Sequence, residues 1–378
     1  MKILMINYEF PPVGGGAGRA TQHLCETIAA RGVAVDVVTS RGAAQEQFFC
    51  GKARVFSLPV HRKSIHQTGL LAMIEFIWHA CRCIKKLMKT ESYSLVHYFF
   101  SVPTGIISLV INKSIPYIVS VRGGDVPGYN SGEFQLLHVL LKPVNVGIWK
   151  RAARVVALSE HLGNAAQKSW NRLHFSTIPN GVDTRLFHPE RKNRGSEKCL
   201  NLLCVARLVP WKGIDYLLEA VALIDEFEWK LTIIGTGQCK NQLLKKAAQQ
   251  GVNKKTRFID PQPHNELPQW YSNADIFVLP SSGDSFGQVF LEAMACGLAV
   301  IAAQSGGIKD ILCHEKGGLL VKPHDSVSLK KAILSLGKNP DLREKMGSFN
   351  REMVVEKYSW DAAAAGYLHE YKRITSAS

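Results

Sequence analysis

Short apolar runs alternate with longer amphipathic segments along the whole chain. The runs are rich in β-branched residues and apolar at consecutive positions, as strands buried on both faces of a parallel sheet are. The segments between them have the length and period of crossover helices, so the pattern predicts βαβ units. The predicted strands are residues 3–7, 33–39, 54–58, 95–98, 117–121, 154–158, 200–206, 230–234, 257–259, 276–279, 299–302 and 318–321.

The strand–helix alternation stops once and starts again, which divides the chain. Its 378 residues exceed what one hydrophobic core usually serves. Asn180 and Gly181 form a turn signal, and a charged stretch follows before a new strand at Leu200. We therefore predict an α/β fold of two Rossmann-like, doubly wound parallel-sheet domains, residues 1–190 and 191–358. Ser359 is a suitable N-cap for a last helix over residues 359–378.

The net charge of +15 is concentrated in the first half of the chain. Residues 1–190 hold 21 lysine and arginine residues against 11 aspartate and glutamate residues, a difference of +10. Such a basic half is suited to nucleic acid, an anionic membrane or an acidic acceptor. No nucleic-acid motif and no interleaving of aromatic and basic residues is present, so we do not expect a nucleic-acid partner.

Targeting signals are not visible in the sequence. The first strand begins at once, without the apolar region of a signal peptide, and no apolar run approaches the ~20 residues of a membrane span. The nine cysteines include no CxxC pair, which fits free thiols in a reducing compartment. We expect a cytoplasmic protein.

The turn after the first predicted strand, PPVGGGAGRA, holds three consecutive glycines. Gly14, Gly15 and Gly16 let backbone N–H groups approach a phosphate beside the positive end of the following helix. The turn does not match the dinucleotide fingerprint, because Arg19 stands where the third glycine belongs. A phosphate site and a plain tight turn stay equal alternatives from this segment alone.

Two cations follow the first strand of the second domain, in VARLVPWKG. Arg207 stands at the carboxyl end of that strand, where open α/β sheets bind ligands. Lys212 comes five residues later, and Gly213 opens the next helix. Two cations that converge on one crevice suit a pyrophosphate, whereas either cation alone would be read as surface charge.

Two carboxylates eight residues apart mark the segment PSSGDSFGQVFLEAMACG. Asp284 stands in a loop before a predicted helix, Glu292 lies within the helix, and Phe286 and Gly287 supply backbone groups at its start. A loop carboxylate can hold sugar hydroxyls and a helical one a ribose diol, because each accepts paired hydrogen bonds. Taken alone, the two carboxylates are read more simply as a helix-terminal charge and a surface glutamate.

Together these motifs resemble those of the family-4 glycosyltransferases, which have the GT-B fold. The resemblance covers nearly the whole chain and includes SVPTG, IPNGVD, IIGTG, ADIFVLPS, SGGIKDI and the terminal YSWDAAAAGYLHEY in this order. It implies two domains that face each other across a cleft. The first would bind the acceptor and the second the nucleotide sugar, and the last helix would pack back on the first domain.

The resemblance also gives roles to residues by position. Arg207 and Lys212 match the family's diphosphate-binding cations. Gly15 and Gly16 match the glycine turn that faces the donor phosphates. Glu292 matches the glutamate that binds the ribose.

Two positions depart from the family pattern. Asp284 stands where the family usually has a glutamate that contacts the donor sugar, and its side chain is shorter by one methylene, roughly 1.5 Å. Arg122 stands where many members have a histidine, although some read RGGD as here. We assign Arg122 and Asp125 to the acceptor and donor-sugar side, with a glycine turn flanked by a surface salt bridge as the alternative.

The resemblance implies a reaction with these parts. A hexosyl-type sugar moves from a nucleotide-diphosphate donor to a hydroxyl of a glycan or lipid-linked acceptor with retained anomeric configuration. The expected pathway is cell-envelope polysaccharide or lipopolysaccharide synthesis. The sequence has no DxD motif for Mg²⁺ or Mn²⁺, so we expect Arg207 and Lys212 to stabilise the leaving phosphate without a metal or cofactor. A nucleotide-sugar epimerase of GT-B fold and a non-catalytic nucleotide-sugar-binding subunit stay open as alternatives.

One helical segment of the first domain bears on a membrane partner. Residues 61–89 place a basic flank, Arg82, Lys85, Lys86 and Lys89, beside apolar positions at helical spacing. These apolar positions are Leu70, Ile74, Ile77, Cys81, Ile84 and Met88. The apolar face either packs in the core of an ordinary crossover helix or lies with its basic flank on an anionic membrane. Peripheral attachment to the cytoplasmic face of a membrane is therefore an open expectation.

Overall fold

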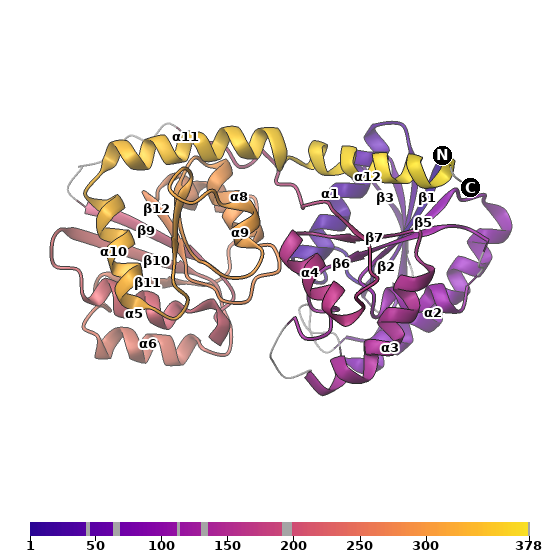
Figure 1. Cartoon of the computed structure of the whole chain (residues 1–378), viewed down its shortest axis with the longest axis horizontal. Coiled ribbons are helices and arrows are strands. Elements are labelled where there is room, and N and C mark those ends of the chain that lie inside the picture. Colours follow the sequence, from indigo (N-terminus) through magenta and orange to yellow (C-terminus); the bar gives the residue numbers. More distant parts are fainter. Residues whose placement is uncertain (43–45, 63–68, 112–113, 130–134, 191–198, 377–378) are drawn as a thin grey trace. The chain divides into compact units, whose positions relative to one another are not determined.

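The chain folds into two α/β units, each built on one sheet (Figure 1). The structure, a computed structural model, describes residues 1–42, 46–62, 69–111, 114–129, 135–190 and 199–376. The first unit comprises Met1–Gly181 and Trp360–Ser378, and the second comprises Val182–Ser359. The sequence-based domain limits were residues 190 and 358.

The first sheet has eight strands in the order β3-β4-β2-β1-β5-β6-β7-β8. Strand β3 is antiparallel to β4, and the other pairs are parallel. The strands are β1 (Lys2–Ile6), β2 (Ala34–Gly42), β3 (Glu46–Cys50), β4 (Ala53–Pro59), β5 (Leu95–Phe99), β6 (Tyr117–Val121), β7 (Arg154–Ala157) and β8 (Phe175–Thr177). The helices are α1 (Gly16–Ala30), α2 (Leu70–Thr90), the 3₁₀ helix η1 (Thr104–Leu109), α3 (Gln135–Arg151), α4 (Glu160–Ser169) and α12 (Trp360–Ser376).

The second sheet has six parallel strands in the order β11-β10-β9-β12-β13-β14. The strands are β9 (Cys199–Val205), β10 (Glu228–Ile234), β11 (Thr256–Ile259), β12 (Ile276–Leu279), β13 (Ala299–Ala303) and β14 (Gly318–Val321). The helices are η2 (Pro210–Lys212), α5 (Ile214–Ala222), α6 (Lys240–Gln249), α7 (Leu267–Ser272), α8 (Gln288–Ala295), α9 (Ile308–Ile311), α10 (Ser326–Gly337) and α11 (Pro340–Lys357). Helices cover both faces of each sheet (Figure 1).

All twelve predicted strands are present, and the predicted doubly wound fold is confirmed. Strands β3 and β8 were missed. Most of β3 is exposed, because it is an antiparallel edge strand, and β8 is a three-residue edge strand that is half-buried along its length. Neither has the run of buried β-branched residues that marks a central parallel strand.

The order of strands reverses once in each sheet. Strand β1 lies between β2 and β5, and β9 lies between β10 and β12. The connections that leave such neighbouring strands run to opposite faces of the sheet, so a crevice opens at their carboxyl ends. This position is where open α/β sheets bind ligands, and the segments that follow β1, β5, β9 and β12 are therefore the ones to inspect.

Helix α12 belongs to the first unit because buried polar contacts attach it to the sheet. The Tyr371 hydroxyl lies 2.6 Å from Nδ1 of His97, and Nε2 of His97 lies 2.7 Å from the Ser120 hydroxyl. The Tyr367 hydroxyl completes the chain at 2.9 Å from Ser120. Burial lowers the pKa of His97 well below its usual range, so the ring is neutral and can donate at one nitrogen and accept at the other.

Helix α2 buries a different face from the predicted one. Of the predicted apolar positions only Ile84 is buried, while Leu70 and Ile74 are exposed. The face packed in the core comprises Ala72, Phe76, Ala80, Ile84 and Leu87. The helix is thus apolar on more than one side. No helix among the described residues is long and apolar enough to cross a membrane.

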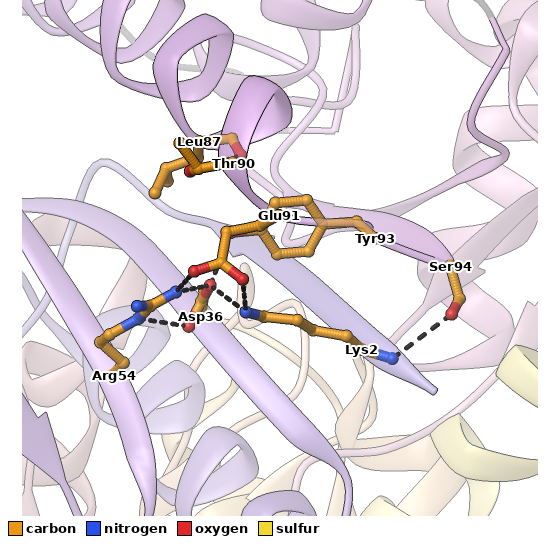
Figure 2. A network of polar contacts seen from close by, with 8 residues as sticks. All are labelled: Lys2, Asp36, Arg54, Leu87, Thr90, Glu91, Tyr93 and Ser94. Carbon is orange, nitrogen blue, oxygen red and sulfur yellow. Dashed lines mark hydrogen bonds and ion pairs between the residues drawn. The ribbon is translucent and has the colours of Figure 1, made fainter.

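A buried carboxylate ties together the amino-terminal ends of three strands (Figure 2). Asp36 of β2 accepts bonds from Arg54 of β4 at 2.9 and 2.7 Å and from the Tyr93 hydroxyl at 2.5 Å. Lys2 of β1 lies 3.3 Å away, and Glu91 bridges Lys2 and Arg54. A nicotinamide-dependent dehydrogenase would need an acid at the opposite, carboxyl end of this strand to hold a ribose. The Asp36 network is therefore structural.

Replacing Asp36 by asparagine is expected to lower the free energy of unfolding by about 2 to 3 kcal/mol, since it leaves Arg54 and Lys2 short of a buried counter-charge. Urea unfolding measures the change. As a control, Glu228→Gln breaks an exposed pair with Lys255 and should cost less than about 1 kcal/mol. Equal, small losses in the two variants would show that the network does not stabilise the sheet.

Candidate functional site

At the switch point of the second sheet, three predicted site residues lie on the segments that follow two neighbouring strands. Arg207 follows β9, Lys212 ends the adjoining 3₁₀ helix, and Asp284 follows β12, the neighbouring strand. Nζ of Lys212 lies 2.5 Å from Oδ1 of Asp284, and only 8% of Lys212 is exposed. The Lys212 cation therefore faces a carboxylate from a segment 72 residues further along the chain.

Backbone contacts hold the two segments in this arrangement. The Ser282 N–H donates to the carbonyl oxygen of Trp211 at 2.8 Å, and the Ser281 hydroxyl donates to the same oxygen at 3.3 Å. The exposed Arg207 guanidinium lies 5.7 Å from the centre of the Trp211 ring. The two cations and the loop of Asp284 thus share one small region at the carboxyl end of the sheet.

The segment SGGIKDI fixes the same loop from its other side. The Gly307 N–H donates to the carbonyl oxygen of Asp284 at 2.9 Å. Gly306 has φ +63°, and a Cβ at this position would lie 2.3 Å from that oxygen. Only glycine satisfies both the left-handed backbone and the close approach. The glycine pair of this motif therefore positions Asp284.

Glu292 lies on α8, is 4% exposed, and is held by two polar side chains. The Tyr271 hydroxyl donates to one carboxylate oxygen at 2.9 Å, and Nε2 of His264 lies 3.3 Å from the other. Burial, followed by the charge of Glu292, raises the pKa of Tyr271 well above its usual range, so the hydroxyl stays a donor. Because each carboxylate oxygen accepts more than one bond, Glu292 can be oriented by these side chains and still accept from a diol.

Phe286 and Gly287 stand at the start of α8, as predicted. Phe286 as a whole is 2% exposed, so its ring is buried beneath the loop. Gly287 is the N-cap, and no side chain caps the helix. An anion at this end would meet the positive end of the helix dipole.

The glycine turn of the first unit leads into α1, whose N-cap is Gly15. A Cβ on Gly15 or Gly16 would meet no atom within 4 Å, so space is open beside both backbones. The Gly15 N–H donates to a carboxylate oxygen of Glu9 at 3.3 Å. Gly14 has φ +92°, and a Cβ there would lie 2.6 Å from the same carboxylate. A phosphate at this turn would have to share or displace Glu9.

Arg122 and Asp125 are both buried and do not form the surface salt bridge that was the alternative interpretation. The Asp125 carboxylate accepts from the backbone N–H groups of Ser101, Arg122 and Gly123 at 2.7, 2.8 and 3.0 Å. Burial raises the pKa of Asp125, and these bonds partly offset the effect. Asp125 thus fixes the loops after β5 and β6 to each other.

The Arg122 side chain extends away from Asp125. It donates to Oδ1 of Asn180 at 2.7 Å and lies 4.8 Å from the centre of the Phe99 ring. The sequence marked Asn180 only as part of a turn, in IPNGVD. A guanidinium that stacks and donates in this way is oriented by its neighbours, which suits a residue that contacts a ligand.

Several residues with a place in these sites were missed from the sequence, namely Glu9, Arg62, His264 and Tyr271. Arg62 donates to the Ser40 hydroxyl at 2.7 Å and to the Tyr8 carbonyl, beside the carboxyl ends of β1 and β2, and burial lowers its pKa. His264 and Tyr271 stand just before ADIFVLPS. A histidine and a tyrosine upstream of that motif were the available signal, but their contact with Glu292 depends on the tertiary fold.

A metal site was not predicted from the sequence. Within the ranges that the structure describes, no three His, Cys, Asp or Glu side chains lie together in a way that could hold a metal ion. Metal-independent chemistry stays a prediction that activity measurements must test.

Known proteins match this chain over its length. The family model of group 1 glycosyl transferases matches residues 188–353, and that of glycosyltransferase family 4 matches residues 14–186. An uncharacterised glycosyltransferase of Methanocaldococcus jannaschii is 26% identical over 393 residues, which cover 98% of each chain. A D-inositol 3-phosphate glycosyltransferase of Streptomyces bingchenggensis is 34% identical over 209 residues, which cover 50% of this chain and 46% of that protein.

Two solved structures share the fold. Sucrose-phosphate synthase from Thermosynechococcus elongatus superposes with a TM-score of 0.87 at 24% identity and covers 100% of both chains. HepE of Anabaena, solved in complex with UDP-glucose, superposes with a TM-score of 0.72 at 19% identity over 100% of this chain and 99% of its own. Identities this low show the fold alone.

The contact between Tyr271 and Glu292 predicts a loss of stability in Tyr271→Phe. The change removes one donor from a buried carboxylate, which should cost about 1 to 3 kcal/mol. Tyr216→Phe is a matched control, because the hydroxyl of Tyr216 makes no hydrogen bond within the described residues. Urea unfolding of both variants gives the comparison, and an unchanged Tyr271→Phe protein would mean that Tyr271 does not hold Glu292.

Proposed function

The chain belongs to the family-4 glycosyltransferases of GT-B fold, and on that premise we propose that it transfers a hexosyl-type sugar from a nucleotide-diphosphate donor. The proposed reaction retains the anomeric configuration and delivers the sugar to a hydroxyl of a glycan or lipid-linked acceptor. The observation that carries the proposal is the contact of Lys212 with Asp284 at the switch point of the second sheet, with Arg207 beside Trp211 on the same segment as Lys212.

The two cations suit the electrostatic demand of this reaction. Cleavage of the bond between the anomeric carbon and the diphosphate builds negative charge on the leaving phosphate. The exposed Arg207 can bind phosphate oxygens in a bidentate manner, and the buried Lys212 supplies a point charge. Charge stabilisation in a site partly shielded from water is worth more than the same contact in solvent. We propose that these residues take the place of a metal ion.

Two carboxylates are proposed to bind different parts of the donor. Glu292, held by Tyr271 and His264, is proposed to accept bonds from the ribose diol. Asp284 is proposed to contact the sugar while it remains beside Lys212. Phe286 and Gly287 contribute backbone groups at the start of α8. The Anabaena structure supports a nucleotide-sugar donor as the ligand class, since HepE was solved with UDP-glucose.

The acceptor is assigned to the first unit. Arg122 is oriented at the end of β6, where it can contact the acceptor or the donor sugar. Gly15 and Gly16, whose backbone is open to a ligand at the end of β1, are proposed to bind phosphate of the donor. The excess of positive charge in residues 1–190 supports an acceptor with anionic groups. We propose a cell-envelope glycan or lipid-linked acceptor, as in polysaccharide or lipopolysaccharide synthesis, used on the cytoplasmic side of the membrane.

Removal of either cation should slow transfer. Arg207→Ala and Lys212→Ala are each expected to lower kcat/KM at least about tenfold, or about 1.4 kcal/mol of transition-state stabilisation. Lys245→Ala, which removes an exposed cation of α6, is the matched control and should act as wild type. Initial rates with a panel of nucleotide sugars give the values.

The same assay in excess EDTA should show full activity, because no metal ion is needed in the proposed mechanism. Activity that is lost in EDTA and restored by Mg²⁺ or Mn²⁺ would contradict it.

Substitution of the two carboxylates should produce different defects. Glu292→Gln is expected to weaken both the nucleoside diphosphate and the intact donor about ten- to a hundredfold, since it removes a charged acceptor from the ribose. Asp284→Asn should bind the bare nucleoside diphosphate at least as tightly as wild type, because Lys212 loses its counter-charge, and yet transfer more slowly. Calorimetry with both ligands separates the two. A nucleoside diphosphate that binds Asp284→Asn as weakly as Glu292→Gln would refute this division of roles.

An acceptor-dependent product distinguishes transfer from the alternatives. An epimerase would release a nucleotide and an epimerised sugar without an acceptor, and a binding subunit would release neither. Proton NMR of the product also gives the anomeric configuration, which retention predicts to be that of the donor.

A further inference from the structure

Helix α2 of the first unit has an apolar stripe that faces solvent. Its core face is made of small and aromatic residues, among them Ala72, Phe76 and Ala80. On another face, Leu71 is 83% exposed, Ile74 55% and Trp78 51%. These three residues are spaced three and four positions apart, so they form one continuous stripe along the helix. Burial of this stripe is not needed to pack the helix on its own sheet.

The same stripe continues into cations. Arg82, Lys85 and Lys89 follow Trp78 at spacings of four, three and four, and all three are exposed. The guanidinium of Arg82 lies 3.9 Å from the centre of the Trp78 ring, which joins the apolar part to the basic part. One exposed face of α2 is therefore apolar over its first half and cationic over its second.

Helix α2 has almost no acidic residues to balance these cations. The helix contains a single acidic residue, Glu75. Its carboxylate accepts the His61 N–H at 2.8 Å and lies 2.7 Å from Nδ1 of the same histidine. These contacts lower the pKa of Glu75, so its charge is engaged locally. The positive charge of Arg82, Lys85 and Lys89 is thus left to face solvent.

Elements next to α2 also carry exposed apolar side chains. The 3₁₀ helix η1 packs against both α2 and α3, which lie on the same side of the first sheet (Figure 1). Val110, which follows η1, is 61% exposed, and Val139 and Leu140 of α3 are 67% and 65% exposed. Among the described residues of the first unit, most of the exposed large apolar side chains lie on these three elements.

We propose that this face of α2 docks on an anionic lipid bilayer. Leu71, Ile74 and Trp78 would enter the boundary between headgroups and acyl chains, and Arg82, Lys85 and Lys89 would contact anionic headgroups. Charge complementarity selects the occupant, because an apolar stripe alone would fit any apolar surface, whereas the row of cations requires a negative one. Tryptophan at the junction suits the membrane interface, where its ring is partly apolar and partly hydrogen-bonded.

The shape of the feature also favours a bilayer over a folded protein. Its six residues lie along one straight edge of a helix, which a flat surface can touch at every position. The docking does not depend on sugar transfer. Docking would also bring the first unit to the surface that holds a lipid-linked acceptor, and only this consequence rests on the proposed function.

Flotation with two kinds of vesicle tests the proposal. Vesicles of equal parts phosphatidylcholine and phosphatidylglycerol should carry the full-length protein upward at low salt and release it at high salt, because salt screens the attraction. Vesicles of phosphatidylcholine alone should carry little. Protein that stays at the bottom with both compositions at low salt would overturn the proposal and leave a protein partner as the occupant of this face.

Two triple variants show whether vesicle binding depends on the position of the cations or only on the net charge. The triple variant Arg82→Gln, Lys85→Gln and Lys89→Gln should reduce the fraction bound to anionic vesicles about tenfold or more. The control triple Lys245→Gln, Lys254→Gln and Lys338→Gln removes equal charge from exposed positions of the second unit and should bind as wild type. Equal losses in both triples would mean that net charge alone attracts the protein, which would overturn docking through α2.

The apolar stripe has its own pair of variants. Leu71→Gln with Ile74→Gln should lower binding, whereas Val327→Gln with Val355→Gln, at exposed positions of the second unit, should not. Trp78→Phe should remove most of the blue shift of fluorescence that anionic vesicles induce. A urea unfolding transition like that of the wild type shows that a variant is folded. Nucleoside diphosphate binding, which we place in the second unit, should be retained, so a failure of docking is distinct from a failure of the proposed transfer. Unchanged flotation of the Leu71 and Ile74 variant would contradict insertion.

Discussion

The proposed donor site depends on how the chain leaves the carboxyl ends of β9 and β12. These strands are neighbours in the sheet although more than 70 residues separate them in sequence, and their connections leave on opposite faces. Arg207 and Lys212 arrive from one strand and Asp284 from the other. The first sheet repeats the arrangement at β1 and β5, where the glycine turn and the Ser101 loop begin. The same physical rule thus explains where both units keep their polar, close-packed loops.

Two of the groups that we propose to bind phosphate are each in contact with a carboxylate of the protein. Asp284 faces Lys212, and Glu9 accepts from the N–H of Gly15 at the start of α1. The first contact balances the charge of the buried Lys212, which would be costly without a partner, and the second satisfies the exposed N–H of Gly15. At either place, a phosphate that binds must share or replace the carboxylate found there. The binding free energy of the ligand is then the difference between its own charged contacts and those that it replaces. The Asp284→Asn substitution removes a charged contact of the protein and so favours binding of the ligand.

Much of the fold could be predicted from the sequence, because central parallel strands are apolar on both faces and the connections between them have helical length. Edge strands β3 and β8 lack that signal. The sequence did not identify the face of α2 that packs in the core, since a helix with Phe76 on one side and Leu71, Ile74 and Trp78 on another has no single apolar stripe. The motifs located Arg207, Lys212, Asp284 and Glu292, but not what holds them. Tyr271, His264 and Glu9 reach these sites only through tertiary contacts that no local pattern encodes.

The central claim is that the second unit binds the nucleotide diphosphate through the segments after β9 and β12. Hydrogen–deuterium exchange of the full-length protein, with and without UDP, ADP and GDP, tests it most directly. We expect at least one of these ligands to slow exchange in residues 206–213 and 283–292, and Lys212→Ala to weaken this protection. Protection confined to other segments of the second unit, or to the first unit alone, would contradict it.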